Sequence, residues 1–338
     1  MAKKRTLVVL ADMTEEERLR TNEFDTSTEE YSIERLYCAK RDNVSVLRLK
    51  IGDFNDREGL KKKILDHEPS CVFNRFEGWS DDSSKEIEFA EILEEVGIPY
   101  TGNSPQTLSV CLDKWGAKTL LKKSGVSVAP GMFIRNIEDI KLEGITFPMF
   151  LKPCFEDASM GIDDSSLVRD KKSLFKVAEE KLKLFPKGLV AEEFLPGGEY
   201  AVGIIGNGPY EVLGLSVLDY TKFKGMSSFL TYDSKWVSNT PEYGLMMPSL
   251  DEPISPAFKK KVLGTALKAA EVFGCSGYFR VDMRERDGES YVIDVNPNPD
   301  ITEGSGFMRM AKKSGIGYIE MLEKIVSLAE ERFAKGRA

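Results

Sequence analysis

The chain has 338 residues, with 47 Lys plus Arg against 55 Asp plus Glu and a formal net charge of −8. This length predicts two or three domains with an ample core, and the acidic balance argues against nucleic acid as a partner. A single histidine, His67, excludes a His-rich zinc site and any mechanism that needs two catalytic histidines. The chemistry must therefore rest on carboxylates, lysines, arginines and glycines.

The cysteines and the N-terminus indicate where the protein resides. The five cysteines are widely spaced and form no Cys-x-x-Cys pair, which predicts reduced thiols and a cytoplasmic location. The apolar run at residues 6–11 is soon followed by acidic residues, so we expect a first strand and no signal peptide. No stretch approaches the roughly 18 apolar residues of a membrane helix, so no membrane partner is expected.

The first hundred residues alternate between strand and helix patterns. Strands are expected at 6–11, 44–50, 71–76 and 98–101, and helices at 32–39, 58–66 and 83–97. Alternation of this kind is typical of an α/β fold with a mostly parallel sheet, here a Rossmann-like domain that we assign to residues 1–104.

The pattern changes after this domain. One long amphipathic helix is expected over 105–123, followed by a strand at 145–153, a small-residue loop at 154–162, and a strand and helix over 165–182. Further strands at 188–195, 198–206 and 211–218 are consistent with antiparallel pairing. We divide this part into a central lobe, 105–190, and a C-terminal lobe, 191–338.

The C-terminal lobe contains an irregular segment, 219–251, of a length that functional loops often have. A helix is expected at 256–273, and a C-terminal helix from about Ile319. Between them, strands at 278–285 and 290–297 are joined by an Asp-Gly hairpin turn.

This hairpin carries the sharpest chemical pattern. Arg280 and Asp282 alternate on its first strand, and Asp294 and Asn296 alternate on its second. Because residues two apart on a strand share a face, pairing would bring one guanidinium and three oxygen-bearing side chains together. Such oxygen ligands suit Mg²⁺ bound with a nucleotide. The alternative is a surface hairpin with an Arg–Asp salt bridge, which the turn-rich segment 296–306 makes less attractive.

A lysine at a strand end supplies a second pattern. Lys152 precedes the loop 154–162, so its ammonium can hold phosphate oxygens while the loop amides close over them. The alternative is a solvated lysine, because the loop matches no Walker sequence. Lys114 lies on a predicted helix, where one lysine carries no signal alone. Three acidic residues could serve a ribose and an adenine amino group, although such residues are common at strand ends: Glu192, Glu193 and Glu199.

Five segments, taken together, resemble the ATP-grasp superfamily and, within it, the D-alanine–D-alanine ligase-like branch. They span residues 103–130, 147–162, 190–204, 231–238 and 279–301. The resemblance covers about Thr101 to the C-terminus and implies a nucleotide held between two antiparallel-sheet lobes.

The resemblance also implies roles for individual residues. Lys114 and Lys152 would reach the phosphates of ATP, and Glu199 would take the ribose. Adenine would be recognised by the strand end made of Glu192, Glu193, Phe194 and Leu195. Mg²⁺, with Mn²⁺ as the alternative ion, would be held by Asp282, Asp294 and Asn296. Lys235 matches a lysine of the mobile loop that closes over ATP, and Ser159 falls in the glycine-rich flap.

The implied reaction joins a carboxylate to an amine. The γ-phosphoryl group passes to a small-molecule carboxylate, an amine attacks the acyl phosphate, and phosphate leaves. Arg280 would hold the developing oxyanion, with Lys235 and Ser159 beside it. Two alternatives are a small-molecule kinase, which needs no amine, and a non-catalytic nucleotide-binding module. A homodimer is compatible with the resemblance.

The departures from the family fall on the substrate side. The family's glycine-rich first turn, with its serine and glutamate, is replaced by residues 10–20, where Glu16 or its neighbours Glu15 and Glu17 could substitute. Asn74 and Arg75 stand where the family has histidine and glycine, and Trp236 replaces a tyrosine. The later glycine turn is also replaced. We therefore expect substrates other than two D-alanines, with candidate contacts from Arg75, Glu16, Asp300 and Ser305.

Overall fold

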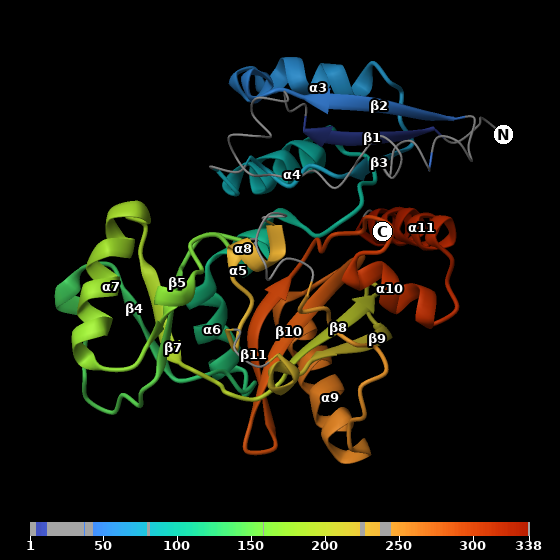
Figure 1. Cartoon of the computed structure of the whole chain (residues 1–338). Coiled ribbons are helices and arrows are strands. Elements are labelled where there is room, and N and C mark those ends of the chain that lie inside the picture. Colours follow the sequence, from blue (N-terminus) through green and yellow to red (C-terminus); the bar gives the residue numbers. More distant parts are fainter. Residues whose placement is uncertain are drawn as a thin grey trace.

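The structure, a computed structural model, describes residues 5–11, 37, 43–79, 82–157, 159–223, 227–236 and 245–336, with only the backbone described at 235–236. Three sheets organise this part of the chain (Figure 1). One is parallel and belongs to the N-terminal domain. The other two are antiparallel and lie side by side below it, which confirms the expected α/β fold with two antiparallel-sheet lobes.

The N-terminal sheet has the strand order β2-β1-β3 and all its pairs are parallel. Its elements are β1 (Thr6–Ala11), β2 (Val44–Leu49), the 3₁₀ helix η1 (Ile51–Asn55), α3 (Arg57–Leu65), β3 (Cys71–Asn74) and α4 (Ser84–Val96). The expected strand 98–101 is reduced to one bridge, between Val72 and Tyr100. The expected helix 32–39 lies outside the described residues apart from Tyr37.

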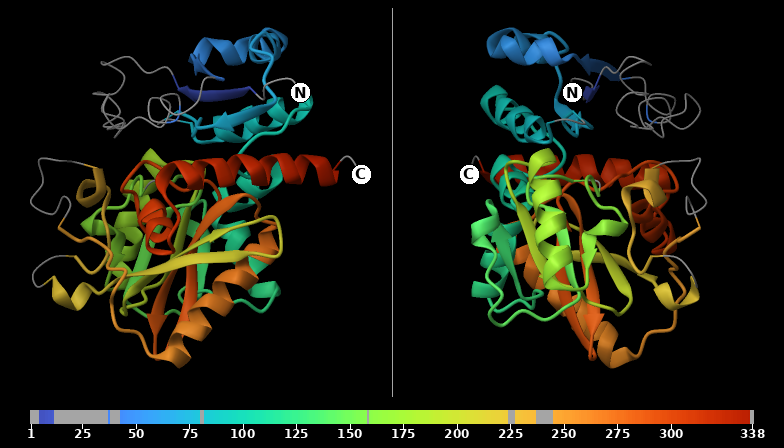
Figure 2. Two further views of the ribbon diagram at one scale, coloured as in Figure 1. Left: turned by 90° about the vertical axis from the view of Figure 1, so that its right-hand side faces the viewer. Right: turned by 60° about the vertical axis from the view of Figure 1, so that its left-hand side comes forward.

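The apolar run of β1 is buried on both faces, as its sequence predicts. Leu7 and Val9 pack with the helices of the N-terminal domain, in one core with Phe89 of α4. Val8 faces the other way, into a core that includes Phe307 and the C-terminal helix. Figure 2 shows this last helix lying between the N-terminal domain and the rest of the molecule. The first and last parts of the chain therefore share a core.

The single helix expected over 105–123 is wrong. The structure has two helices, α5 (Pro105–Leu112) and α6 (Lys114–Lys123), and the chain breaks at Asp113. The Asp113 carboxylate accepts a hydrogen bond from the Gly116 amide at 2.9 Å and so caps α6. A capping carboxylate within an amphipathic pattern ends one helix and starts the next, and it places Lys114 at a helix N-terminus.

The central antiparallel sheet has the order β4-β7-β5-β6. Its elements are β4 (Gly131–Ile134), η2 (Ile137–Asp139), β5 (Met149–Pro153), η3 (Asp164–Ser166), β6 (Leu167–Val168), α7 (Lys171–Leu184) and β7 (Leu189–Glu193). The partners of β7 are β4 and β5, so this strand carries the central sheet past the expected boundary at 190/191. The three-domain division stays a proposal, with its second boundary best placed after β7.

The C-terminal antiparallel sheet has the order β11-β10-β8-β9. Its strands are β8 (Glu199–Ile205), β9 (Glu211–Leu218), β10 (Tyr278–Arg286) and β11 (Glu289–Asn296), with α9 (Pro256–Phe273), α10 (Gly306–Lys313) and α11 (Tyr318–Gly336) as its main helices. Helix α9 packs on one face, and α10 and α11 on the other. The long irregular segment holds η4 (Tyr220–Lys222) and α8 (Tyr232–Trp236). None of the described helices combines the length and apolar character that a bilayer crossing needs.

Candidate functional site

An open cavity, with about 860 Å³ of empty space that is partly open to solvent, lies between the two antiparallel sheets. Its walls come from β5 and β7 of the central sheet, from β8, β10 and β11 of the C-terminal sheet, and from the loop that follows β5. It gathers residues that the sequence places up to 180 positions apart: Lys114, Lys152, Ser159, Glu192, Glu193, Phe194, Leu195, Glu199, Asp282 and Asp294. The residues predicted to hold a nucleotide and a metal thus converge on one cavity, except that Asn296 lies beside its wall and the Lys235 side chain is outside the described part of the structure.

The register of the hairpin is the one that strand alternation predicts. Arg280 pairs with Asn296, and Asp282 pairs with Asp294. Arg280 donates two hydrogen bonds to the Asp282 carboxylate, at 2.7 and 2.8 Å, and Asn296 Nδ2 donates a third at 2.8 Å. Burial lowers the pKa of Arg280, but the carboxylates of Asp282 and Asp294 outweigh it and raise that pKa. The sequence left two alternatives: an Arg–Asp salt bridge, or a cluster of one guanidinium and three oxygen-bearing side chains. Both are present.

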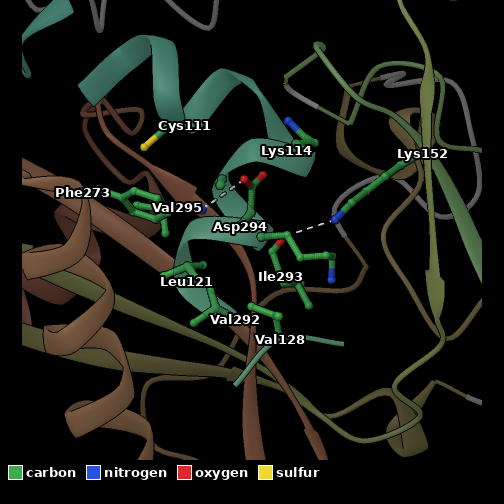
Figure 3. A pocket seen from close by; sticks show the side chains of 12 residues that line it. Cys111, Lys114, Leu121, Val128, Lys152, Phe273, Val292, Ile293, Asp294 and Val295 are labelled. Atoms are coloured by element: carbon green, nitrogen blue, oxygen red, sulfur yellow. Dashed lines mark hydrogen bonds between the residues drawn. The ribbon is translucent and has the colours of Figure 1, made fainter. Parts of the chain in front are cut away.

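A bulge in the hairpin turns one backbone carbonyl toward the central sheet. Met283 pairs with Val292, whereas Asp282 pairs with Asp294, so Ile293 is the extra residue. Its carbonyl oxygen accepts a hydrogen bond from Lys152 Nζ at 3.1 Å. In Figure 3 the Lys152 side chain reaches across from β5 toward Ile293, close to Asp294. One lysine thus links the two lobes beside the metal-ligand candidates.

Lys114 approaches the same place from the N-terminus of α6. Figure 3 shows its side chain next to Asp294, and its ammonium forms an ion pair of 2.9 Å with Asp157 in the loop after β5. Burial lowers the pKa of Lys114, but Asp157 and Asp294 outweigh it and raise that pKa. The site therefore keeps Lys114 cationic, and the α6 N-terminus adds positive potential for an anion.

Glu192 is engaged in ways that the sequence did not predict. One carboxylate oxygen lies 2.7 Å from Lys118 Nζ and the other 2.9 Å from Lys152 Nζ, and the residue is 5% exposed. Burial by itself raises the pKa of Glu192, but the two ammonium groups hold it at about 2. Since each oxygen lies close to a lysine ammonium, this carboxylate positions two lysines, and its part in binding adenine stays a prediction. Lys118 was missed because one more lysine on an amphipathic helix carries no signal.

Aromatic rings form another part of the cavity wall. The Phe150 ring lies 4.9 Å from the Phe229 ring and 6.2 Å from the Phe194 ring, measured between centroids. Aromatic and aliphatic walls of this kind suit a flat heterocycle. Phe229 comes from the long irregular segment, whose length had indicated a functional loop. Next to this wall Glu199 accepts a hydrogen bond from the Tyr220 hydroxyl at 2.7 Å.

The donor set fits Mg²⁺ held jointly with phosphate. No three His, Cys, Asp or Glu side chains among the described residues gather as a metal-binding group. What the hairpin offers is two carboxylates, of Asp282 and Asp294, and the Asn296 amide oxygen. Mg²⁺ typically takes one or two carboxylates and completes its shell with water and substrate phosphates. These three side chains would hold the ion, and its chemistry there would be to neutralise charge on the transferred phosphoryl group.

The residues predicted for the substrate side do not line the cavity. Glu16 lies outside the described residues. Arg75 is 3.7 Å from Glu77, and its pKa, which burial lowers, is raised by the charges of Glu77 and Asp300. Asp300 accepts hydrogen bonds from the amide and hydroxyl of Thr302. Arg75 and Asp300 lie where the N-terminal domain meets the loop after β11.

Ser305 and Asn74, two positions on the predicted substrate side, have structural roles. Ser305 Oγ donates to the Asp300 carbonyl at 2.8 Å and caps α10 by accepting from the Met308 amide at 3.4 Å. Its one proton is therefore spent within the chain, which leaves none for a substrate carboxylate. Asn74 is 4% exposed, and its side chain accepts from the Phe76 amide at 3.0 Å.

A half-buried carboxylate on α4, that of Glu86, lies at this junction and was not predicted. Glu86 accepts a hydrogen bond of 2.5 Å from Asn298, whose own side-chain oxygen accepts from the Asn103 amide at 2.9 Å. Burial raises the pKa of Glu86 to about 8, helped by the nearby charges of Glu77 and Asp157, although the Asn298 bond acts the other way. A helical glutamate gives no sequence signal of this kind.

Comparisons with known proteins agree with the fold. Residues 120–327 match the family model described as D-ala D-ala ligase C-terminus. D-alanine–D-alanine ligase B of Chromobacterium violaceum is 27% identical over 76% of this chain and 79% of its own length. The D-alanine–D-alanine ligase of Actinobacillus pleuropneumoniae serotype 5b is 30% identical over 70% of this chain and 74% of its own.

Two solved structures show the same fold. The D-alanine–D-alanine ligase from Bacillus anthracis complexed with ATP superposes with a TM-score of 0.73 at 20% identity, over 99% of this chain and all of that one. The VanG D-Ala:D-Ser ligase from Enterococcus faecalis gives a TM-score of 0.67 at 19% identity, over 97% of this chain and all of that one.

The protein is thus an ATP-grasp enzyme of the ATP-dependent carbon–nitrogen ligase class. Within that class, the chain belongs to the D-alanine–D-alanine ligase family.

Proposed function

We propose that the protein joins a carboxylate to an amine through an acyl phosphate, at the expense of ATP. The observation that carries the proposal is the cavity itself: two lysines, two acidic hairpin residues and an aromatic wall meet between the two sheets. Nothing in this set requires a side-chain nucleophile, which suits a chain with one histidine. Charge stabilisation and positioning dominate phosphoryl transfer, and these residue types supply both.

The residues divide the work by position. Lys114 and Lys152 would bind phosphate oxygens, and the aromatic wall would hold the adenine ring with the backbone of Phe194 and Leu195. Arg280 spends two donors on Asp282, so its remaining N–H groups would stabilise the oxyanion. Ser159 lines the cavity with a left-handed φ of 64°, which suits a tight turn over the phosphates. Lys235 stays a prediction.

The identity of the two substrates is the finer question. Relatives named D-alanine–D-alanine ligases make D-alanine the first compound to assay. The comparisons do not support the sequence-based expectation of a different product, which stays a proposal founded on Asn74, Arg75 and the segment 10–20. Binding of Mg²⁺, a homodimer and a cytoplasmic location likewise stay predictions.

The test is ATP-dependent phosphate release with D-alanine and then with other amino acids, singly and in pairs, followed by mass spectrometry. Release that needs an amine, with a product lighter by one water than the sum of the two substrates, supports the ligase. A phosphorylated product formed without an amine would replace it with a kinase. Nucleotide binding with no turnover across the screen would favour a non-catalytic module.

A further inference from the structure

One loop of the cavity carries charges that oppose its predicted role. The loop 154–162, after β5, is predicted to close over the phosphates of a nucleotide, yet it brings the carboxylates of Glu156 and Asp157 to the cavity wall. Phosphate groups are anions, and like charges repel strongly at short range in a site shielded from water. The proposed reaction uses neither carboxylate, so their contacts must show what they do.

The two carboxylates differ in what they contact. Asp157 Oδ1 accepts a hydrogen bond of 2.9 Å from Lys114 Nζ, and the side chain of Lys114 is 9% exposed. This is the one ion pair that Lys114 forms with a described residue. Glu156, the preceding residue, forms no ion pair with any residue that the structure describes. Of these two carboxylates, Asp157 alone is paired with a lysine of the cavity.

The Lys114–Asp157 pair lies where a phosphate group is expected. Lys114 is predicted to bind the phosphates, and Figure 3 shows its side chain next to Asp294, one of the predicted metal ligands. A phosphate held by Mg²⁺ on Asp294 would therefore reach the Lys114 ammonium. Two anions on one ammonium lie close to each other and repel. Asp157 and the phosphate would thus compete for Lys114.

The loop is fixed at both ends, and Asp157 lies between the fixed points. At its start, the Cys154 carbonyl accepts a hydrogen bond from the Lys114 amide at 3.1 Å. Near its end, the Gly161 carbonyl accepts from Lys181 Nζ at 2.7 Å, and Lys181 is 4% exposed. The Asp157 side chain, in contrast, is 48% exposed. It can therefore turn toward solvent while both ends of the loop keep their contacts.

The other cavity lysine has a pairing of a different kind. Lys152 pairs with Glu192 of β7, whose second carboxylate oxygen contacts Lys118, and Glu192 is buried. Separating that network would leave a buried charge without a partner, which is costly. An ion pair with one half-exposed member contributes little stability and separates readily. The pair at Lys114 is therefore the one suited to exchange its anion.

We infer that Asp157 is a built-in competitor for the phosphate position on Lys114, and that a phosphate group of ATP displaces it on binding; this rests on the proposed function. The ion pair neutralises a nearly buried ammonium until a nucleotide arrives. Part of the free energy of nucleotide binding is then used to separate the pair, so Asp157 lowers the affinity for ATP.

Calorimetric titration of the protein with ATP in the presence of Mg²⁺, without other substrates, tests the inference. Asp157→Asn keeps the size of the side chain and removes its charge. It is expected to bind ATP about fivefold more tightly than the wild type, or more, because coupling between two competing groups has this magnitude. If Asp157→Asn does not fold, as judged by circular dichroism, Asp157→Ser takes its place with the same expectation.

Two controls show whether the effect passes through Lys114. Glu156→Gln removes the same charge from the neighbouring residue of the cavity wall, and it should change the affinity for ATP less than about twofold. Lys114→Met completes a double-mutant cycle. In that background Asp157→Asn should change the affinity less than about twofold, because no ammonium is left to compete for.

The outcomes separate the inference from the proposed function. Weaker binding of ATP by Asp157→Asn means that the carboxylate helps to hold ATP and Mg²⁺, and it overturns the inference. So does an equal gain in Glu156→Gln, or a gain that persists with Lys114→Met. If the wild type does not bind ATP, the proposed function fails and the inference fails with it. If the wild type binds ATP and Asp157→Asn binds it equally well, only the inference fails.

Discussion

Two glutamates, one buried and one half-buried, show how differently the two halves of this protein treat charge. Glu192, in the cavity between the antiparallel sheets, has a lysine on each carboxylate oxygen, and its pKa is held at about 2. Glu86, at the junction with the N-terminal domain, has an amide donor and acidic neighbours, and burial raises its pKa to about 8. Burial alone therefore does not decide the charge state; the partner does.

This contrast distinguishes two regions of the molecule: the cavity between the antiparallel sheets and the junction with the N-terminal domain. The proposed nucleotide cavity is a network in which lysines and carboxylates pair with one another. At the junction, Glu86 has an amide as its donor, and the nearby charges of Glu77 and Asp157 are acidic. The family resemblance is strongest in the first region and departs in the second.

The largest expected effect is on catalysis in the nucleotide cavity. Asp294→Asn removes one of the two hairpin carboxylates and should slow ATP consumption at saturating substrate about a thousandfold, since metal-assisted charge stabilisation is worth several kcal/mol. Asp287→Asn, in the exposed turn of the same hairpin, is the control and should keep wild-type turnover. Unchanged turnover in Asp294→Asn would disprove the proposed mechanism.

The next largest effect is on stability in the same cavity. Glu192→Gln leaves Lys118 and Lys152 facing each other without a counter-charge, which should lower the free energy of unfolding by about 3–5 kcal/mol in urea titrations. Glu179→Gln, which breaks only an exposed pair with Lys183, should cost about 1 kcal/mol or less. If Glu192→Gln lowers the free energy of unfolding no more than Glu179→Gln does, the ion pairs of Glu192 with its two lysines do not stabilise the fold.

The pH dependence of that loss has a definite sign. The folded-state pKa of Glu192, about 2, lies below its ordinary value of 4.5. Its stabilising contribution is therefore fully present above pH 4.5 and is lost as pH falls from 4.5 toward 2. Glu192→Gln should flatten the stability profile in that window only.

The third expected effect concerns Glu86 at the junction, where the dependence of stability on pH has the opposite sign to that of Glu192. Because the pKa of Glu86 rises from 4.5 to about 8 on folding, the folded state holds a proton that the unfolded state releases. Wild-type stability should fall as pH rises from 4.5 to 8, and Glu86→Gln should be about 2 kcal/mol more stable than wild type at pH 8. Glu91→Gln on the exposed side of α4 is the control, and equal slopes in all three proteins would refute the contrast between the two glutamates.

The smallest effect tests one predicted substrate residue. Ser305→Ala removes the N-cap of α10 and should lower the free energy of unfolding by about 1 kcal/mol, with the KM of each substrate unchanged. Asp170→Ala removes the cap of α7, far from the junction, and should cost a similar amount. A raised KM in Ser305→Ala alone would restore this hydroxyl to the substrate site.

Most elements could be read from the sequence because their signals are local. Helix α9 begins and ends at the predicted residues, since Pro256 starts it and Gly274 follows it in a left-handed conformation. The break at Asp113 was missed because the amphipathic pattern of α5 continues into α6. Helix α10 was missed because it follows a Gly- and Pro-rich segment without a clear periodic start.

Only some of the residues that line the cavity could be predicted, because only local spacing can be read from the sequence. The hairpin ligands follow from alternation, which fixes the face of every residue once a strand is recognised. Lys118 and Phe229 could not be found in this way, because each gains its role from a partner on a distant element.

The sequence by itself determined most of the strands, the residues that the hairpin pairs and the exclusion of histidine mechanisms, since these depend on residue types and short spacings. Only the tertiary structure decided which charges are paired. It placed Glu192 between two lysines, left Glu86 with an amide, and paired Lys114 with Asp157. The physical reason is that a buried group's charge and function depend on neighbours within a few ångströms, and folding brings those neighbours from distant parts of the chain.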